Sequence, residues 1–236
     1  MEVKSFTAKQ AKDSLPPGRA EFGFSLLEVA IVLLMTIVIV AFALPNYVAI
    51  QKFMRISGDS RSIASLMEEA KLIAAANFTH ARVRADLISN TYHLEIWNKS
   101  GGAGGAGCWQ TNADVANACT VAGTSPVFYL SSGVSFSFGA INAAPANTQL
   151  TIGQAPICYT GAAGQAGNST TIANTACIEF NSRGIPSDPT SGGKPDANGA
   201  FYLSDASSVY GVTLLSSGEI QSWYASNNLS FTWQVR

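Results

Sequence analysis

The stretch Gly23-Phe24-Ser25-Leu26-Leu27-Glu28, followed by VAIVLLMTIVIVAFALP over residues 29–45, decides the fold of this chain. No residue between Glu28 and Lys52 is charged, which makes an uncharged run of 23 residues. About 20 apolar residues in a helix span the hydrocarbon core of a bilayer, because each residue adds about 1.5 Å. The run therefore predicts a transmembrane helix. A secretory signal peptide is the rival interpretation, but it has a shorter apolar stretch and a small-residue cleavage site, whereas Pro45-Asn46-Tyr47 follows here.

The residues around this run predict its orientation. Before Phe24 the chain is polar and carries four basic and three acidic side chains: Lys4, Lys9, Lys12 and Arg19, against Glu2, Asp13 and Glu21. Positive flanks stay in the cytoplasm, so the C-terminal part is expected outside. Glu28 lies at the entry end of the apolar run, where an unpartnered carboxylate is costly and indicates a functional role.

The same residues carry a family resemblance. The sequence from Gly23 to Glu28, joined directly to an apolar helix, resembles the type III signal of prepilins, shared by type IV pilins and type II secretion pseudopilins. The resemblance implies cleavage between Gly23 and Phe24 by a prepilin peptidase, followed by N-methylation of Phe24. It implies that Glu28 pairs with the N-terminal amine of a neighbouring subunit, and that Pro45 kinks the helix. A plain single-pass anchor is the alternative interpretation.

The resemblance also implies partners and a location. The partners are other pilins or pseudopilins through the N-terminal helix, the prepilin peptidase, the inner-membrane assembly machinery and membrane lipid. The chain would cross the bacterial inner membrane once, with its head in the periplasm, and then enter a pilus or pseudopilus. A buried amine and a buried glutamate are each costly alone, and pairing across subunits would compensate both costs. The sequence does not separate a secretion pseudopilus from a type IV pilus.

Helical periodicity continues beyond the apolar run. Apolar residues recur at spacings of three, four or seven: Phe53, Ile56, Ile63, Met67, Ala70 and Ala74, with Leu66 and Ile73 beside them. This stripe indicates a helix that packs one side on a domain. The expected organisation is a cleaved leader at 1–23, a helix at 24–76 whose part 24–45 serves membrane and filament core, and a β-rich periplasmic head at 77–236. Residues 100–175 form an unassigned insertion in this scheme.

The head is expected to be built of short antiparallel strands. Residues 82–87 and 92–97 alternate polar and apolar around a turn-like stretch, which predicts a β-hairpin. Further strands are predicted at 126–130, 134–138, 149–152, 157–159, 176–180, 200–203, 210–215, 219–224 and 231–235. Strands behind one long helix make an α+β fold. The resemblance specifies it as the type IV pilin fold, a long N-terminal helix packed on an antiparallel sheet.

Two stretches of the head carry a second resemblance. The residues CIEFNSRG at 177–184 and GVTLLSSGEI at 211–220 look like a turn and a closing hairpin in minor pilins and pseudopilins of the GspH/FimT type. Where that hairpin often has arginine after its glycine, this chain has Glu219. The resemblance implies a structural subunit in protein secretion or pilus biogenesis, not an enzyme. Some relatives instead bind DNA, so a head that captures DNA or a surface ligand is the alternative.

Charge argues against nucleic acid. The chain holds 14 Lys and Arg against 15 Asp and Glu, a net charge of −1, and only 12% of its residues are charged. Beyond residue 100 three basic residues, Arg183, Lys194 and Arg236, face six acids. Phosphate binding depends on a cationic surface. Nucleic acid is therefore not expected as a partner.

Four cysteines, Cys108, Cys119, Cys158 and Cys177, lie on the side expected to be outside. An even count in an oxidising compartment favours disulfides, and four cysteines allow three pairings. Pairing of sequence neighbours would close loops of about 11 and 19 residues, each worth roughly 3 kcal/mol by chain entropy. A zinc site needs closely paired ligands, and no Cys-x-x-Cys occurs.

Other candidate chemistry is weak. His80 and His93 have no partner at metal-ligand spacing, and Asp188, Asp196 and Asp205 do not follow the calcium-loop spacing. Residues 102–107 match Gly-x-Gly-x-x-Gly, but the dinucleotide motif needs a helix directly after it, and Cys108-Trp109-Gln110 follows. No nucleophile elbow or triad is evident. We expect no catalytic site, no cofactor and no metal.

Overall fold

A computed structural model describes residues 25–102, 105–111, 119, 126–162, 170–188, 199–228 and 230–236. The expected leader at 1–23 and the cleavage residues Gly23 and Phe24 lie outside these ranges. The chain divides into two compact units, Met1–Tyr47 and Val48–Arg236. One helix, α1 (Leu26–Ala76), is continuous through both.

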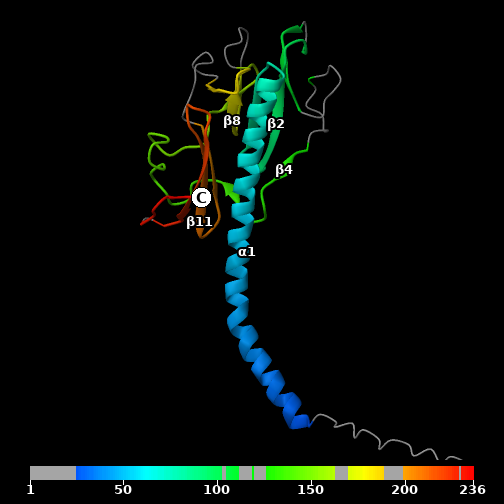
Figure 1. The fold of residues 1–236 in the computed structure, drawn as a ribbon, viewed down its shortest axis with the longest axis vertical. Helices are drawn as coiled ribbons and strands as arrows, with labels where there is room; N and C mark the ends of the chain where they lie inside the picture. The colour runs from blue at the N-terminus through cyan, green and yellow to red at the C-terminus, as the bar shows by residue number, and fades with distance from the viewer. Residues whose placement is uncertain are drawn as a thin grey trace, which may run out of the picture. The chain divides into compact units, whose positions relative to one another are not determined.

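In the second unit α1 buries the stripe that the periodicity predicts. Ile56, Ile63, Met67, Ala70 and Ala74 are all fully buried. Their spacing of three, four or seven residues places them on one face of a helix with 3.6 residues per turn. Figure 1 shows this cyan half of α1 running alongside β2, β8 and β11. The stripe thus forms the helical side of the main core.

The first sheet contains the predicted hairpin. Its strands are β1 (Ala81–Asp86), β2 (Thr91–Asn98), β3 (Cys108–Thr111), β8 (Thr175–Phe180) and β9 (Pro186–Ser187), in the order β3-β2-β1-β8-β9. A short strand, β4 (Phe128–Tyr129), also pairs with β2. Every pairing is antiparallel. Val83 lies opposite Leu94 on one side and Ile178 on the other, so these three apolar side chains share one face.

The second sheet follows later in the chain. It is formed by β5 (Ser135–Phe136), β10 (Ala200–Ser204), β11 (Ser208–Leu214), β12 (Ile220–Ser226) and β13 (Gln234–Val235), in the order β13-β12-β11-β10-β5. A separate ribbon joins β6 (Cys158–Tyr159) to β7 (Thr171–Ile172). Phe201, Leu203 and Val212 of the second sheet belong to the same core as the stripe of α1. One helix behind antiparallel strands confirms the α+β class.

One predicted strand is wrong. Residues 149–152 alternate polar and apolar side chains, yet no strand forms there, and Leu150 is 99% exposed. The reason is that a side chain occupies the neighbouring sheet edge: the Tyr202 N–H donates to Gln154 Oε1 at 2.9 Å, and Gln154 Nε2 donates to the Tyr202 carbonyl at 2.8 Å. The Gln154 amide replaces a strand's backbone on β10.

Three strands were not predicted. β3 begins directly after Gly107, β7 lies between turns, and β9 lies in a turn-rich segment. β7 and β9 are two residues long, and β3 is four. Such strands form because a partner strand offers its edge, and they are too short for an alternating pattern to reveal them.

Candidate functional site

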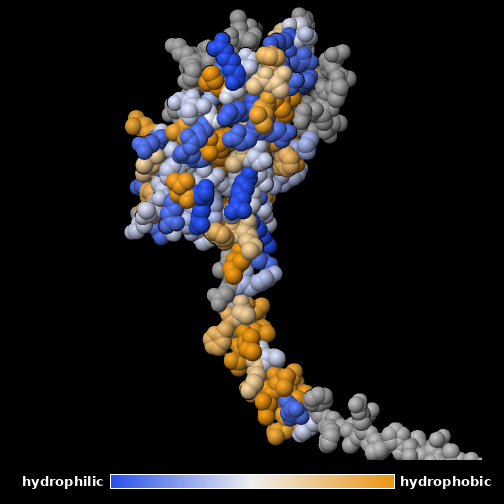
Figure 2. Space-filling model, in the orientation of Figure 1, coloured by the Kyte–Doolittle hydropathy of each residue, from blue (hydrophilic) through white to orange (hydrophobic). Residues whose placement is uncertain are grey.

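The part of α1 in the first unit exposes an apolar surface. Leu26–Leu44 is long and apolar enough to cross a membrane, with a mean hydropathy of 2.9, and none of it is buried. Figure 2 shows this segment almost entirely orange, whereas the head mixes blue, white and scattered orange. Apolar area in water costs roughly 25 cal/mol per Å². A surface of this extent suits contact with lipid or with another apolar surface.

A single polar side chain interrupts the apolar run between Glu28 and Leu44. It is Thr36, whose hydroxyl donates to the Leu33 carbonyl at 2.8 Å. Hydroxyls in helices commonly bond a carbonyl of the preceding turn, which removes the cost of placing them in an apolar medium. The segment consequently presents no unsatisfied side-chain hydrogen-bonding group over these residues.

Ser25 and Glu28 start the helix. The Leu27 N–H donates to Ser25 Oγ at 3.3 Å, and the Glu28 N–H donates to the Ser25 carbonyl at 2.9 Å. Serine followed three residues later by glutamate is the capping-box pattern, and a carboxylate in the first turn also favours the helix dipole. The Ser-x-x-Glu spacing in the sequence already indicates a helix start at this point.

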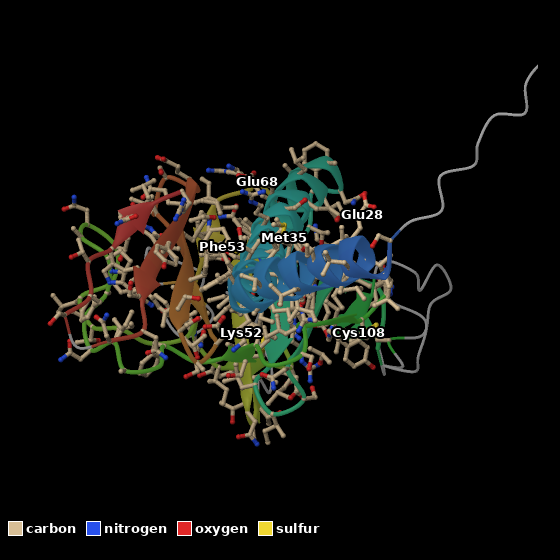
Figure 3. The ribbon with its side chains drawn as sticks, turned by 90° about the horizontal axis from the view of Figure 1, so that it is seen from below. Glu28, Met35, Lys52, Phe53, Glu68 and Cys108 are labelled. Atoms are coloured by element: carbon tan, nitrogen blue, oxygen red, sulfur yellow. A yellow bond between two sulfur atoms is a disulfide. The ribbon has the colours of Figure 1, made fainter. Side chains whose placement is uncertain are left out.

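The Glu28 carboxylate is exposed in the described chain. No Lys, Arg or His among the described residues forms an ion pair with it. Figure 3 labels it near the first turn of the blue helix. Pro45 lies inside α1, and its effect on the helix axis stays a prediction.

Two disulfides fasten the head. Cys108 pairs with Cys119, with Cα atoms 5.8 Å apart, and Cys158 pairs with Cys177, with Cα atoms 5.1 Å apart. Of the three pairings open to the sequence, the structure has the one between sequence neighbours. The second disulfide joins the β6–β7 ribbon to β8, a strand inside the first sheet. All four cysteines are thereby oxidised, and none is left as a thiolate ligand.

The first sheet buries charge on the face turned away from α1. Alternation along β1, β2 and β8 places Arg82, Glu95 and Glu179 there, and these side chains are 2%, 3% and 2% exposed. Arg82 Nε donates to Glu95 Oε2 at 2.5 Å, and its Nη1 donates to the Tyr159 carbonyl at 2.6 Å. The guanidinium also lies 4.0 Å from the ring centre of Trp109. Its charge is therefore compensated inside the head.

Both histidines belong to this charged face. His80 Nδ1 lies 2.7 Å from Glu179 Oε1, and His93 Nε2 lies 3.2 Å from Glu95 Oε1. Arg84 Nη1 contacts the same Glu95 oxygen at 3.3 Å. Burial raises the pKa of Glu95, but the charges of Arg82, His93 and Arg84 outweigh it and lower the pKa to about 2. The sequence did not reveal Glu179, 99 residues from His80, whereas Glu95 follows His93 by two residues on the same predicted strand, a spacing that places both side chains on one face.

The two head stretches that carry the second resemblance meet at Lys71 of α1. Asn181 begins a turn that ends at Gly184 with φ +70°, and Leu215 begins one that ends at Gly218 with φ +80°. Lys71 Nζ donates to the Gly218 carbonyl at 2.8 Å. A Cβ atom on Gly184 would lie 3.2 Å from Lys71 Cγ. Glycine at these turns lets both sheets approach the helix.

The remaining candidate residues have local roles. The glycine-rich residues 102–107 lead into β3, a strand, where a dinucleotide site would need a helix. Asp205 Oδ1 accepts bonds from Ser207 N at 2.7 Å and Ser208 N at 2.7 Å, which closes its own turn. Within the ranges that the structure describes, no three His, Cys, Asp or Glu side chains are grouped to hold a metal ion. Asp196 lies outside those ranges.

The chain was compared with protein families, curated sequences and solved structures. No protein-family model and no curated protein sequence matches the chain. Among solved structures it is similar to the minor pseudopilin EpsH from the type 2 secretion system of Vibrio cholerae. The match has 12% identity and a TM-score of 0.32, and it covers 77% of this chain and 96% of that one. A TM-score this low does not establish a shared fold.

Proposed function

We propose that the chain is a structural subunit of a filament, a minor pilin or pseudopilin of the GspH/FimT type. It is cleaved between Gly23 and Phe24 by a prepilin peptidase and methylated on Phe24. The apolar segment of α1 holds it in the bacterial inner membrane, with the head in the periplasm. From there the assembly machinery inserts it into a type II secretion pseudopilus or a type IV pilus.

A single combined observation carries this proposal. The motif ending at Glu28 leads directly into a helix whose described side chains, through Leu44, are all exposed and nearly all apolar. An ordinary anchor needs the apolar run but not the charge at its entry, because a neutral glutamine would serve the start of the helix as well. A filament core explains both, because the helices pack on one another and the carboxylate finds a partner in a neighbouring subunit.

The head supports a mechanical role. The stripe of α1, two sheets, two disulfides and the Lys71 contact bind the second unit into one body. DNA capture, the alternative, gains no support from the described arginines of β1: Arg82 is buried against Glu95, and Arg84 contacts the same carboxylate. The proposal therefore assigns the head to contacts between subunits.

The Glu28→Gln variant tests the assembly role. Glutamine keeps the length and the polarity of the side chain but removes the charge that would pair with a neighbouring N-terminal amine. We expect normal leader removal and membrane insertion, with at least a tenfold loss of the protein from sheared filaments or from cross-linked subunit complexes. Immunoblots of the membrane and filament fractions measure both quantities.

Glu69→Gln is the matched control, because Glu69 is an exposed glutamate in the second unit's part of the same helix. It should assemble as the wild type does. Wild-type incorporation of Glu28→Gln would refute the pairing of Glu28 across subunits.

A further inference from the structure

A cavity of about 190 Å³ opens in the head at the beginning of its helix. It is lined by Lys52, Arg55, Ser132, Gly133, Val134, Asp205 and Ala206. We call it the Lys52–Arg55 cavity. A water molecule occupies roughly 30 Å³ of liquid, so the cavity has room for several waters or for a polar group of that combined size.

The place of Lys52 along the chain relates the cavity to a membrane. Lys52 is the first charged residue after the 23 uncharged residues that follow Glu28. At about 1.5 Å per residue such a run is about 35 Å long, slightly more than the roughly 30 Å of bilayer hydrocarbon. With Glu28 at one boundary of the membrane, the length of the helix places Lys52 and Arg55 among the lipid headgroups at the other boundary.

The two cations are not neutralised by the described protein. No carboxylate among the described residues forms an ion pair with Lys52 or Arg55, and both side chains are exposed. Asp205, the acid of the cavity, directs its Oδ1 to Ser207 and Ser208. Burial raises its pKa, but those hydrogen bonds outweigh burial and lower it, so Asp205 stays ionised. The lining of the cavity thus has two positive charges and one carboxylate, and that carboxylate already accepts hydrogen bonds from its own turn.

The opposite wall of the cavity is held in place. Asp59, one turn of α1 beyond Arg55, accepts hydrogen bonds from Ser131 N at 2.9 Å and Ser131 Oγ at 3.0 Å. The Val134 N–H donates to the Ser131 carbonyl at 2.9 Å and closes the loop that carries Ser132 and Gly133. The polar loop is therefore preorganised, which reduces the entropy lost on binding.

An aromatic side chain lies at the same level of the helix. Phe53 is 40% exposed, and its ring centre lies 6.3 Å from that of Tyr210 and 6.2 Å from that of Tyr224. Figure 3 labels Lys52 and Phe53 on different sides of α1. Aromatic side chains gather at membrane interfaces, and basic side chains there contact lipid phosphates.

We propose that the Lys52–Arg55 cavity binds the phosphate of an anionic phospholipid and so holds the head at the membrane surface before assembly. The inference rests on the proposed membrane insertion and adds a lipid site in the head. The ligand is a phosphate diester with a net negative charge. Its oxygens accept hydrogen bonds from the two cations and from the Ser132 hydroxyl.

The test uses the full chain in vesicles of phosphatidylethanolamine and phosphatidylglycerol, mixed three to one. Electron paramagnetic resonance compares the association of spin-labelled phosphatidylglycerol with that of spin-labelled phosphatidylcholine. Near a membrane surface each cation contributes about fivefold in affinity for anionic lipid. We expect a preference for phosphatidylglycerol that salt weakens, and a severalfold loss of it in the double variant Lys52→Gln, Arg55→Gln.

Lys99→Gln is the matched control. Lys99 is also an exposed lysine, but its Nζ donates to the Phe78 carbonyl at 2.7 Å, just beyond the C-terminal end of α1. This variant should keep the wild-type preference. Circular dichroism and intact disulfides on a non-reducing gel confirm that the variants are folded.

Three results would overturn the lipid site. The double variant keeps the preference, or Lys99→Gln loses it equally, or inorganic phosphate at fixed ionic strength abolishes it, which would assign the cavity to a free anion. Flotation of the vesicles in a density gradient tests the proposed membrane insertion separately, because chains that are not inserted do not float with the vesicles.

Discussion

At the scale of single residues, Glu95 forms more ion pairs with described residues than the other described carboxylates of the head do. Its carboxylate contacts Arg82, Arg84 and His93, although it is almost completely buried. A buried pair of this kind adds little net stability over an apolar pair, but removal of one partner costs several kcal/mol. The cluster therefore makes the fold of the first sheet sensitive to the charge of one carboxylate.

The stability of the head should fall in acid because of Glu95. Its pKa of about 2 in the folded protein is below the ordinary value of 4.5. A lowered pKa contributes stability that is complete above about pH 5 and is lost as the pH falls towards 2. We expect the free energy of unfolding to lose on the order of 2 kcal/mol more between pH 7 and pH 3 in the wild type than in Glu95→Gln.

Urea unfolding of the full chain in a non-ionic detergent measures this difference. Comparison with Glu95→Gln at each pH removes the contribution of the other carboxylates and of His80. Equal losses in the two proteins would show that the Glu95 charge does not stabilise the fold.

Asp59 shows what the sequence does not reveal at this scale. Its spacing of three from Ile56 and four from Ile63 places it beside the apolar stripe, in keeping with its exposure of 8%, but its bond to Ser131, 72 residues away, has no local signal. Burial raises its pKa, and the bonds from Ser131 oppose that rise. No local pattern predicts such a partner, because the contact depends on where a distant loop crosses the helix.

At the scale of elements, the apolar stripe of α1 determines which face of the helix packs on the two sheets. Met67 is fully buried, whereas Leu72, five residues later on the same helix, is 67% exposed. Removing a buried methionine side chain costs about 2–5 kcal/mol, because transfer energy and a cavity add together. Met67→Ala should therefore lower the free energy of unfolding by that amount. Leu72→Ala should change it by less than about 0.5 kcal/mol.

Thermal and urea unfolding of the two alanine variants, in the full chain, distinguish these expectations. A loss for Leu72→Ala as large as that for Met67→Ala would mean that α1 meets the sheets with a different face.

The Cys158–Cys177 disulfide is the second contribution at this scale. It closes 19 residues and fixes the β6–β7 ribbon to the first sheet. In the chain-entropy model a loop of this length is worth roughly 3 kcal/mol. We expect the double variant Cys158→Ala, Cys177→Ala to unfold at a clearly lower temperature than the wild type. An unchanged melting temperature, with all four cysteines shown oxidised in the wild type by mass spectrometry, would contradict this.

The elements differ in how far the sequence predicts them. The helix and the hairpin of β1 and β2 follow from long periodic patterns, and the structure has them within two residues of the expected bounds. At 149–152 the pattern of a strand is present, but Gln154 and the backbone of Ser137 and Ala155 bond the edge of β10 instead. β9 is two residues long and depends on β8 for its backbone bonds. Tertiary context decides such segments, not local preference.

At the scale of the whole molecule, the two units differ in the polarity of their surfaces. The helix of the first unit is exposed and apolar, and the second unit buries its apolar residues between α1 and two sheets. The uncharged run and the motif before it were visible in the sequence, and so was the set of cysteines. The partners of Lys71 and His80 were not, because each contact joins residues far apart in the chain.

The central claim is that the chain is processed as a prepilin and functions as a filament subunit. N-terminal mass spectrometry of the protein purified from membranes of its host tests this most directly. We expect a mature chain that begins at Phe24 and carries one methyl group on its α-amine. A protein that retains residues 1–23, or one cut after the apolar run, would contradict the account.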